Sequence, residues 1–178
     1  MAAKRPFSAK IKDDMEKEKP PWWQGPRGEG YVIIQFMLFG IVFFAPKSWP
    51  GWPAWMPPWS IMGIVIGLLL GGVGGLLILA GLMSLGGNLT AVPRPIENGK
   101  MVRSGAYKLV RHPIYSGIII GAVGYALLQN GIFTLGYALI LFFFFDIKSR
   151  REEQWLCEKY ADYPVYQQQV KKLIPFVY

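Results

Sequence analysis

Four long apolar stretches dominate this sequence, at residues 31–45, 60–86, 114–128 and 132–145, and none of them contains Asp, Glu, Lys, Arg or His. Crossing a hydrocarbon core of about 30 Å takes roughly 20 residues of α-helix. The second stretch exceeds that length, whereas the third and fourth are shorter and are separated by a short turn. The pattern predicts an all-α integral membrane protein with about four transmembrane helices, of which the last two form a tight hairpin.

The composition agrees with a membrane location and excludes several other classes of protein. Hydrophobic residues make up 52% of the chain and charged residues 17%, which is more apolar than a soluble domain of 178 residues. A single Cys and a single His exclude a disulfide framework and a metal site built from thiolates or clustered histidines. The net charge of +8 comes without a long basic tract, so we expect the lipid bilayer as a partner and no nucleic acid.

Positive charges alternate along the chain. Lys and Arg are frequent in residues 1–30, in residues 87–113 and from residue 146 onwards, whereas residues 46–59 hold only Lys47. Cytoplasmic loops of membrane proteins retain positive charge, and tryptophans gather at the interfaces. We therefore expect a multi-pass protein whose N- and C-termini are cytoplasmic, with the Trp-rich 46–59 loop in the outer interface.

The same patterns divide the chain into three parts. Residues 1–29 are expected to be a flexible cytoplasmic N-terminal segment, because they mix acidic and basic side chains and lack the apolar centre of a cleavable signal. Residues 30–87 contain the first two transmembrane helices. Residues 88–178 hold the helical hairpin and a cytoplasmic tail.

Glycines recur at four-residue spacing in the second apolar stretch. They are Gly63, Gly67, Gly71 and Gly75, and Gly117 and Gly121 repeat the spacing in the third stretch. Small residues on one helix face allow neighbouring backbones to approach closely. The spacing predicts close packing between these two helices.

Polar side chains that can do chemistry concentrate in residues 88–115 and 146–166. The hairpin returns the chain to the side that it left, so His112 and Glu153 are expected at the same membrane surface. Pro113 favours a helix start at this point, because proline suits the first turn of a helix and biases the residue before it towards an extended conformation.

The fourth helix is expected to continue beyond the membrane to near Tyr160, forming part of a cytoplasmic C-terminal helical cap. Lys148 and Glu152 lie four residues apart on one face of this helix, whereas Glu153 shares another face with Asp146. The adjacent glutamates therefore point in different directions. We do not expect them to form the shared-proton carboxylate pair of acid–base hydrolases.

Taken singly, the charged residues leave their roles open. Arg111 suits either a cation at the membrane interface or a ligand for an anion, for which the unpaired amides at a helix start are also suited. His112 suits either a capping residue or a side chain that changes charge near neutral pH.

The two polar stretches together carry a more specific pattern. Its residues are Asn88, Leu89, Thr90, Pro93, Pro95, Tyr107, Arg111, His112, Pro113, Tyr115, Gly117, Glu152, Glu153, Leu156, Tyr160, Tyr163, Tyr166, Val170 and Pro175. This pattern resembles the integral-membrane methyltransferases that include isoprenylcysteine carboxyl methyltransferase and the phospholipid N-methyltransferases. Residues 88–178 are accordingly expected to form a methyltransferase-like core.

The resemblance implies S-adenosylmethionine as the methyl donor and a lipophilic small molecule from the bilayer as the acceptor. The residues it implies for donor binding are Tyr107, His112, Pro113, Tyr115, Gly117, Glu152 and Glu153. The expected catalytic residues are Arg111, Arg150 and Glu152, and no metal is expected. An arginine would orient a carboxylate acceptor, whereas Glu152 or His112 would accept a proton from an amine. The methylated group, whether a carboxylate, an amine or a thiol, and the oligomeric state stay open.

Two alternatives also stay open. The segments 157–160 and 174–178 resemble the ending of the sterol reductases, which would imply hydride transfer from NADPH. A non-catalytic subunit of a membrane complex with the same fold is the other alternative.

Overall fold

The computed structural model describes residues 25, 27–53, 55–90, 92–95 and 98–178. Within these residues the protein is helical and has no strand. The expected flexible segment 1–29 lies largely outside the described residues.

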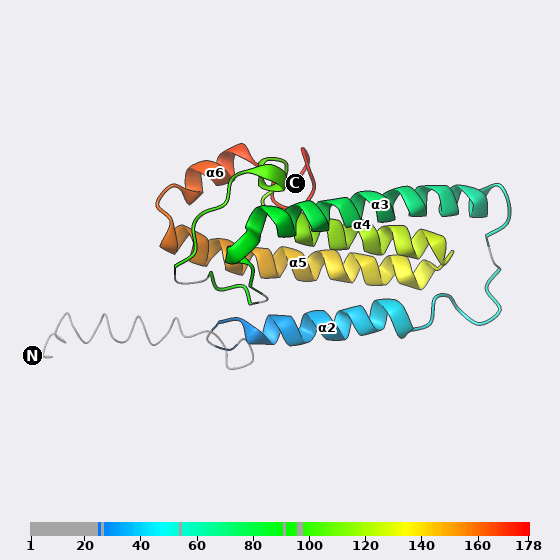
Figure 1. Ribbon diagram of the computed structural model, residues 1–178. Helices are drawn as coiled ribbons and strands as arrows, with labels where there is room; N and C mark the ends of the chain where they lie inside the picture. The colour runs from blue at the N-terminus through cyan, green and yellow to red at the C-terminus, as the bar shows by residue number, and fades with distance from the viewer. Residues whose placement is uncertain (1–24, 26, 54, 91, 96–97) are drawn as a thin grey trace, which may run out of the picture.

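Four apolar helices run side by side along one direction (Figure 1). They are α2 (Glu29–Phe44), α3 (Trp59–Leu85), α4 (Pro113–Leu128) and α5 (Ile132–Lys159). The helices α3 and α5 are long and apolar enough to cross a membrane. At 1.5 Å per residue, the 16 residues of α2 and of α4 reach only about 24 Å. The all-helical fold class is therefore confirmed. Of the four apolar helices, two are long enough to cross a membrane.

Glycine allows α3 and α4 to pack with their backbones nearly in contact. A Cβ atom added to Gly67 would lie 2.7 Å from the carbonyl oxygen of Gly124, and one added to Gly74 would lie 2.6 Å from that of Gly117. Both distances are too short for a real Cβ contact. The predicted close packing of these two helices is confirmed.

The predicted glycine face is wrong in detail. A Cβ added to Gly71 or to Gly75 would meet nothing within 4 Å, so these two glycines do not face α4. The buried glycines of α3 are Gly63, Gly67, Gly74 and Gly81. Seven residues are close to two helical turns, so the spacing of Gly67, Gly74 and Gly81 keeps one face of α3 against α4, whereas a strict four-residue spacing drifts around the helix.

A pair of alanine substitutions tests this helix contact. We expect Gly74→Ala to lower the free energy of unfolding by about 1–3 kcal/mol, because the new methyl group meets rigid backbone across the contact. Thermal unfolding in detergent micelles measures the effect. Gly71→Ala is the matched control on the open face and should leave the melting temperature unchanged or slightly higher. Equal destabilisation by both substitutions would contradict this packing.

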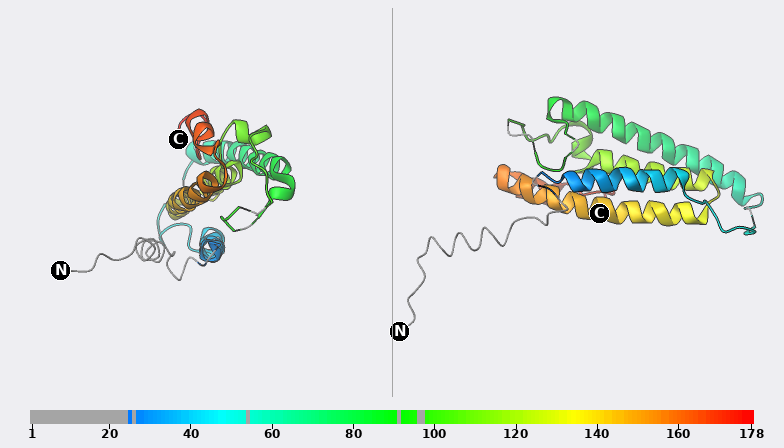
Figure 2. Two further views of the ribbon diagram at one scale, coloured as in Figure 1. Left: turned by 90° about the vertical axis from the view of Figure 1, so that its left-hand side faces the viewer. Right: turned by 90° about the horizontal axis from the view of Figure 1, so that it is seen from below.

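The helix α2 stands apart from the α3–α4 pair. It packs mainly against α5 and runs alongside it (Figures 1 and 2). The rings of Tyr31 and Phe144 contact each other across the α2–α5 boundary, with centroids 6.4 Å apart. The helix α2 is therefore attached to the bundle through α5, and residues of both α2 and α3 line the cavity described below.

The end of the bundle where α5 finishes is covered by a helical cap, as predicted. The short helix α6 (Tyr163–Gln169) follows α5, and the chain then returns towards the start of α4 (Figure 1). The amides of Arg111 and His112 donate hydrogen bonds to the carbonyls of Lys171 and Lys172, over 2.8 and 3.2 Å. The tail therefore holds the segment that leads into α4.

Candidate active site

A cavity of about 270 Å³ lies beneath this cap and reaches α2 on one side and α3 on the other. That volume is close to the lower end of the range for small-molecule sites. Its apolar lining comes from α2, α3 and α4, from the loop that follows α3 and from Leu156. Its polar lining consists of Gln35, Asn88, Thr90, Lys100, Tyr107, Arg111, His112, Tyr115, Lys148, Glu152, Tyr160, Tyr163 and Tyr166.

The start of α4 fixes His112 at the cavity wall. His112 has φ −125° and ψ 66°, outside the helical region, and Pro113 is the first helical residue, as the sequence predicted. The amide and the hydroxyl of Ser116 each donate to the His112 carbonyl over 2.9 Å. His112 is also only 6% exposed, so the side chains packed around its ring hold the ring in place.

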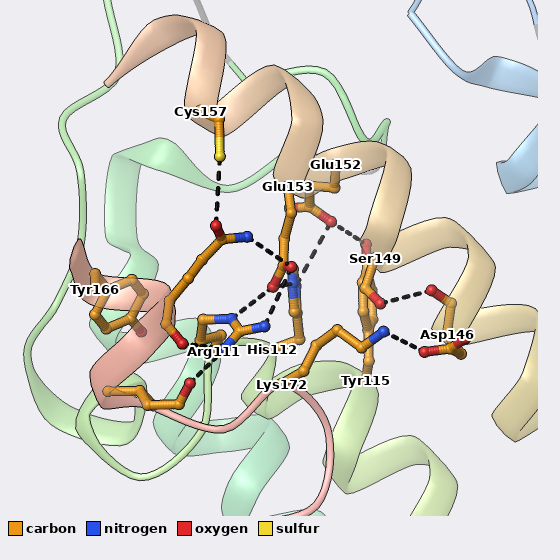
Figure 3. A network of polar contacts seen from close by, with 12 residues as sticks. Arg111, His112, Tyr115, Asp146, Ser149, Glu152, Glu153, Cys157, Tyr166 and Lys172 are labelled. Carbon is orange, nitrogen blue, oxygen red and sulfur yellow. Dashed lines mark hydrogen bonds and ion pairs between the residues drawn. The ribbon is translucent and has the colours of Figure 1, made fainter. Parts of the chain in front are cut away.

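Arg111 and Glu153 form a buried, two-point ion pair at the centre of the polar network (Figure 3). The Arg111 Nε and Nη2 atoms lie 2.6 and 3.2 Å from the two carboxylate oxygens of Glu153. Arg111 Nη1 donates to the carbonyls of Gln167 and Val170, and the Gln167 amide donates to Glu153 over 3.0 Å. This pair therefore ties the start of α4 to α5 and to the cap, and each charge has its counter-ion.

The two adjacent glutamates flank the His112 ring. Glu153 Oε1 lies 3.1 Å from His112 Nε2, whereas Glu152 Oε2 lies 3.8 Å from His112 Nδ1. Glu152 instead accepts a hydrogen bond of 2.9 Å from the Tyr115 hydroxyl, and its side chain is 25% exposed. The two carboxylates therefore have different partners, and Glu152 is the one that lines the cavity.

A stack of aromatic rings lies beside a buried cation at the cavity wall. His112 stacks on Tyr115 with a centroid distance of 5.4 Å, and Tyr115 stacks on Phe145 at 4.6 Å. The ammonium of Lys148 lies 5.1 Å from the centroid of the Tyr115 ring, and Lys148 is only 2% exposed. Its Nζ donates a hydrogen bond of 2.6 Å to the side-chain oxygen of Gln35 in α2. Lys148 thus brings a positive charge to a buried part of the cavity wall.

Tyrosines from the loop and the cap close the other side of the cavity. The Tyr166 hydroxyl donates to the carbonyl of Tyr107 over 2.6 Å, and the Tyr160 hydroxyl donates to that of Gly99 over 2.7 Å. Burial raises the pKa of Tyr166 to about 12 and that of Tyr107 further above its usual range. Both phenols are therefore protonated at neutral pH and present uncharged aromatic surfaces.

The family model of the phospholipid methyltransferases matches residues 62–163, which include α3, α4, α5 and most of the cavity lining. The chain belongs to this family. The resemblance predicted from the sequence is confirmed.

Curated relatives of this chain carry a more specific name than the family does. A probable protein-S-isoprenylcysteine O-methyltransferase of Oryza sativa subsp. indica is 36% identical over 83 residues, 46% of this chain and 44% of the relative. Protein-S-isoprenylcysteine O-methyltransferase B of Arabidopsis thaliana is also 36% identical over 83 residues, covering 46% of this chain and 42% of the relative. The Schizosaccharomyces pombe enzyme is 38% identical over 79 residues, covering 43% and 34%. The matched segment therefore spans less than half the length of these relatives.

The structure brings together most of the residues that the sequence indicated. Tyr107, Arg111, His112, Tyr115 and Glu152 all line the cavity. Glu153 lies directly behind them in the ion pair, where its oxygens already bind protein groups.

Two other expected donor-binding residues support the helices instead. A Cβ atom added to Gly117 would lie 2.5 Å from the carbonyl oxygen of Gly74. Pro113 is buried, and its ring lies 3.1 Å from the Cβ position of Gly81. Both residues set how closely α3 and α4 approach, and neither lines the cavity.

Arg150, an expected catalytic residue, lies outside the cavity lining. Its Nε donates to Asp146 over 2.9 Å, and its Nη2 donates to the Tyr178 hydroxyl over 3.2 Å. Asp146 also binds Lys172 and the Tyr178 hydroxyl (Figure 3 shows the Lys172 contact). Arg150 therefore helps to fasten the returning tail to α5.

Sequence reasoning missed several residues of the site, and Gln35 and Lys148 are the two that contact each other. Gln35 is the only amide side chain in the apolar stretch 31–45, and isolated polar residues within such stretches commonly mark functional sites. Lys148 shares a helix face with Glu152, and that spacing was visible in the sequence. What was not visible is that this face turns towards the cavity.

Proposed function

We propose that this membrane protein is a methyltransferase that moves a methyl group from S-adenosylmethionine to the carboxylate of a lipophilic acceptor, such as an isoprenylcysteine. The observation that carries the proposal is the cavity itself, which joins a carboxylate, a buried cation and several tyrosines to apolar surfaces of α2 and α3. The family and the names of the relatives support the same reaction. They do not favour the reductase alternative.

The polar side of the cavity suits the methyl donor. S-adenosylmethionine supplies a methyl group on a positively charged sulfur, beside an ammonium, a carboxylate and an adenine. Glu152 is suited to the ammonium, and the Lys100 side chain at the edge of the cavity to the donor carboxylate. The uncharged rings of Tyr107 and Tyr166 are suited to the adenine.

Lys148 suits an acidic acceptor better than a basic one. A carboxylate acceptor is already ionised at neutral pH, so no residue has to remove a proton from it. An amine acceptor would meet the ammonium of Lys148, which repels it. We therefore assign to Lys148 the orienting role that the sequence gave to Arg111 or Arg150. The charge of Arg111 is satisfied by Glu153, and Arg150 lies outside the cavity lining. Orientation and exclusion of water are then the main contributions of the protein.

The apolar side of the cavity suits a hydrocarbon chain. Leu82, Leu85 and Leu89 line the cavity at the end of α3 and beyond it. Leu89 is 50% exposed, so it lies at the rim. We propose that the acceptor enters between α2 and α3 from the bilayer, with the cavity and both chain ends on the cytoplasmic side as the charge distribution indicates.

Calorimetry with S-adenosylhomocysteine, the product of the donor, tests this proposal in detergent-solubilised protein. We expect micromolar binding, and we expect Glu152→Ala to weaken it by at least about tenfold, because a charge-assisted hydrogen bond is lost. Glu158→Ala, an exposed glutamate on the same helix, is the control and should bind as the wild type does. A folded wild type that binds no S-adenosylhomocysteine would overturn the proposal. In that case, binding of NADPH would favour the reductase and binding of neither nucleotide would favour the subunit.

A further inference from the structure

The helix α2 contributes a wall of the cavity that the family match does not include. The family model begins at residue 62, whereas α2 ends at Phe44. Three residues of α2 line the cavity: Val32, Gln35 and Phe36. They lie within one and a half turns of each other, so they form one patch on the helix.

The patch contains both a polar and an apolar element. Gln35 accepts the 2.6 Å hydrogen bond from Lys148 Nζ. Phe36 is 65% exposed although it lines the cavity, so it stands at the rim on the side of α2. A ligand that used this patch would therefore place a polar end near Lys148 and an apolar end towards the bilayer.

Gln35 is a neutral amide, so its hydrogen bond leaves the positive charge of Lys148 available to an anion. An ammonium has three N–H donors, and among the described contacts Gln35 takes one of them, while aromatic rings approach without neutralising the charge. Glu152, one helical turn further along α5, acts on this ammonium through its charge, and its described hydrogen bond goes to the Tyr115 hydroxyl instead. A buried ammonium without a directly bound carboxylate is costly to maintain. An anionic ligand that reached it would gain a strong, charge-assisted hydrogen bond.

We propose that α2 recognises the acceptor, with Gln35 as the positioning residue that aims Lys148 at the acceptor carboxylate and Phe36 as a contact for the adjoining apolar chain. This inference rests on the proposed function. It assigns acceptor selection to a helix outside the matched region, whereas most of the proposed donor contacts lie within that region. The ligand class is an amphiphile whose apolar chain ends in a carboxylate.

Two probes that differ in one group test the inference. We would use N-acetyl-S-farnesylcysteine and its carboxamide, and measure the binding of each to the full chain in detergent without methyl donor. The wild type is expected to bind the carboxylate probe more tightly than the carboxamide. Gln35→Glu places a fixed anion on Lys148 and is expected to weaken binding of the carboxylate probe by at least about tenfold, with the carboxamide changed less than about twofold.

Matched variants separate the head of the acceptor from its chain. Gln168→Glu makes the same chemical change at an exposed position and should alter neither affinity. Phe36→Ala should weaken both probes by the same factor, because each probe carries the same apolar chain. Gln35→Leu removes the hydrogen bond without adding charge, and we expect it to weaken the carboxylate probe about threefold or more. It serves as the test if Gln35→Glu does not fold.

The outcomes distinguish this inference from the proposed function. Unchanged S-adenosylhomocysteine binding in the Gln35 variants shows that the donor site is intact, and in turnover with the carboxylate probe they should raise KM more than they lower kcat. Equal effects of Gln35→Glu on both probes, or no effect on the carboxylate probe, would overturn the inference while leaving the donor site standing. A wild type that binds S-adenosylhomocysteine but neither probe would overturn it as well.

Discussion

Replacing Lys148 with methionine is expected to lower kcat/KM for a carboxylate acceptor by about 100-fold, which corresponds to about 2.7 kcal/mol. The physical reason is the loss of a charge-assisted hydrogen bond in a buried site, where such a bond is at the upper end of its range. Methionine fills a similar volume and removes a buried charge, so the variant should fold. Initial rates with labelled donor and N-acetyl-S-farnesylcysteine measure the effect.

Two comparisons make the Lys148 result interpretable. Lys108→Met changes an exposed lysine in the loop before α4 and should leave kcat/KM within about twofold of the wild type. Calorimetry with S-adenosylhomocysteine should give the wild-type affinity for Lys148→Met. If the variant instead lost donor binding and kept its apparent affinity for the acceptor, Lys148 would belong to the donor site and the assignment would be wrong.

Replacing Glu153 with alanine is expected to have the largest effect on stability, about 3–5 kcal/mol. The substitution leaves the guanidinium of Arg111 buried without a counter-ion, because the two side chains are only 11% and 9% exposed. It also removes the acceptor of His112 Nε2. Thermal unfolding in detergent should show a large fall in melting temperature, with loss of S-adenosylhomocysteine binding.

A double-mutant cycle separates the ion pair from general damage to the fold. Combining Glu153→Met with Arg111→Met removes both charges together, and we expect it to recover much of the stability that either substitution alone loses. The exposed ion pair of Arg103 and Asp162, at 3.1 Å, is the control. Asp162→Ala should change the free energy of unfolding by less than about 1 kcal/mol. A Glu153→Ala effect as small as that would contradict the role of the buried pair.

Hydrophobic patterning predicted the helices well because it reports burial in lipid or protein directly. The helix α3 begins and ends within one residue of the predicted stretch 60–86, and α4 begins one residue before the predicted 114–128. The continuation of α5 beyond the apolar stretch to Lys159 was also predicted. Local signals were sufficient here, because a proline, a glycine or a change in polarity marks each boundary.

The glycine face and the site were predicted only in part because they depend on which way each helix turns. Gly71 and Gly75 fit the four-residue spacing as well as Gly67 does, yet of these three only Gly67 has a Cβ position that points at α4. Arg150 and Lys148 both suited an anion by charge, yet only Lys148 lines the cavity. Residues two positions apart in a helix lie about 200° apart around its axis, so Lys148 and Arg150 point to nearly opposite sides of α5. Charge and spacing alone do not say which of these two sides faces the cavity.

By itself the sequence determined that the chain is an all-helical membrane protein, that its polar residues gather at one end of the bundle, and that Arg111, His112 and the two glutamates lie at the same surface. Those features follow from hydrophobicity, charge and chain order, which are properties of the residues and their spacing. Only the tertiary structure decided that Glu153 neutralises Arg111, that Glu152 faces the cavity, and that Gln35 of α2 holds Lys148. Those contacts join residues 37 to 113 positions apart, and they depend on how the helices are rotated and brought together, which no local pattern specifies.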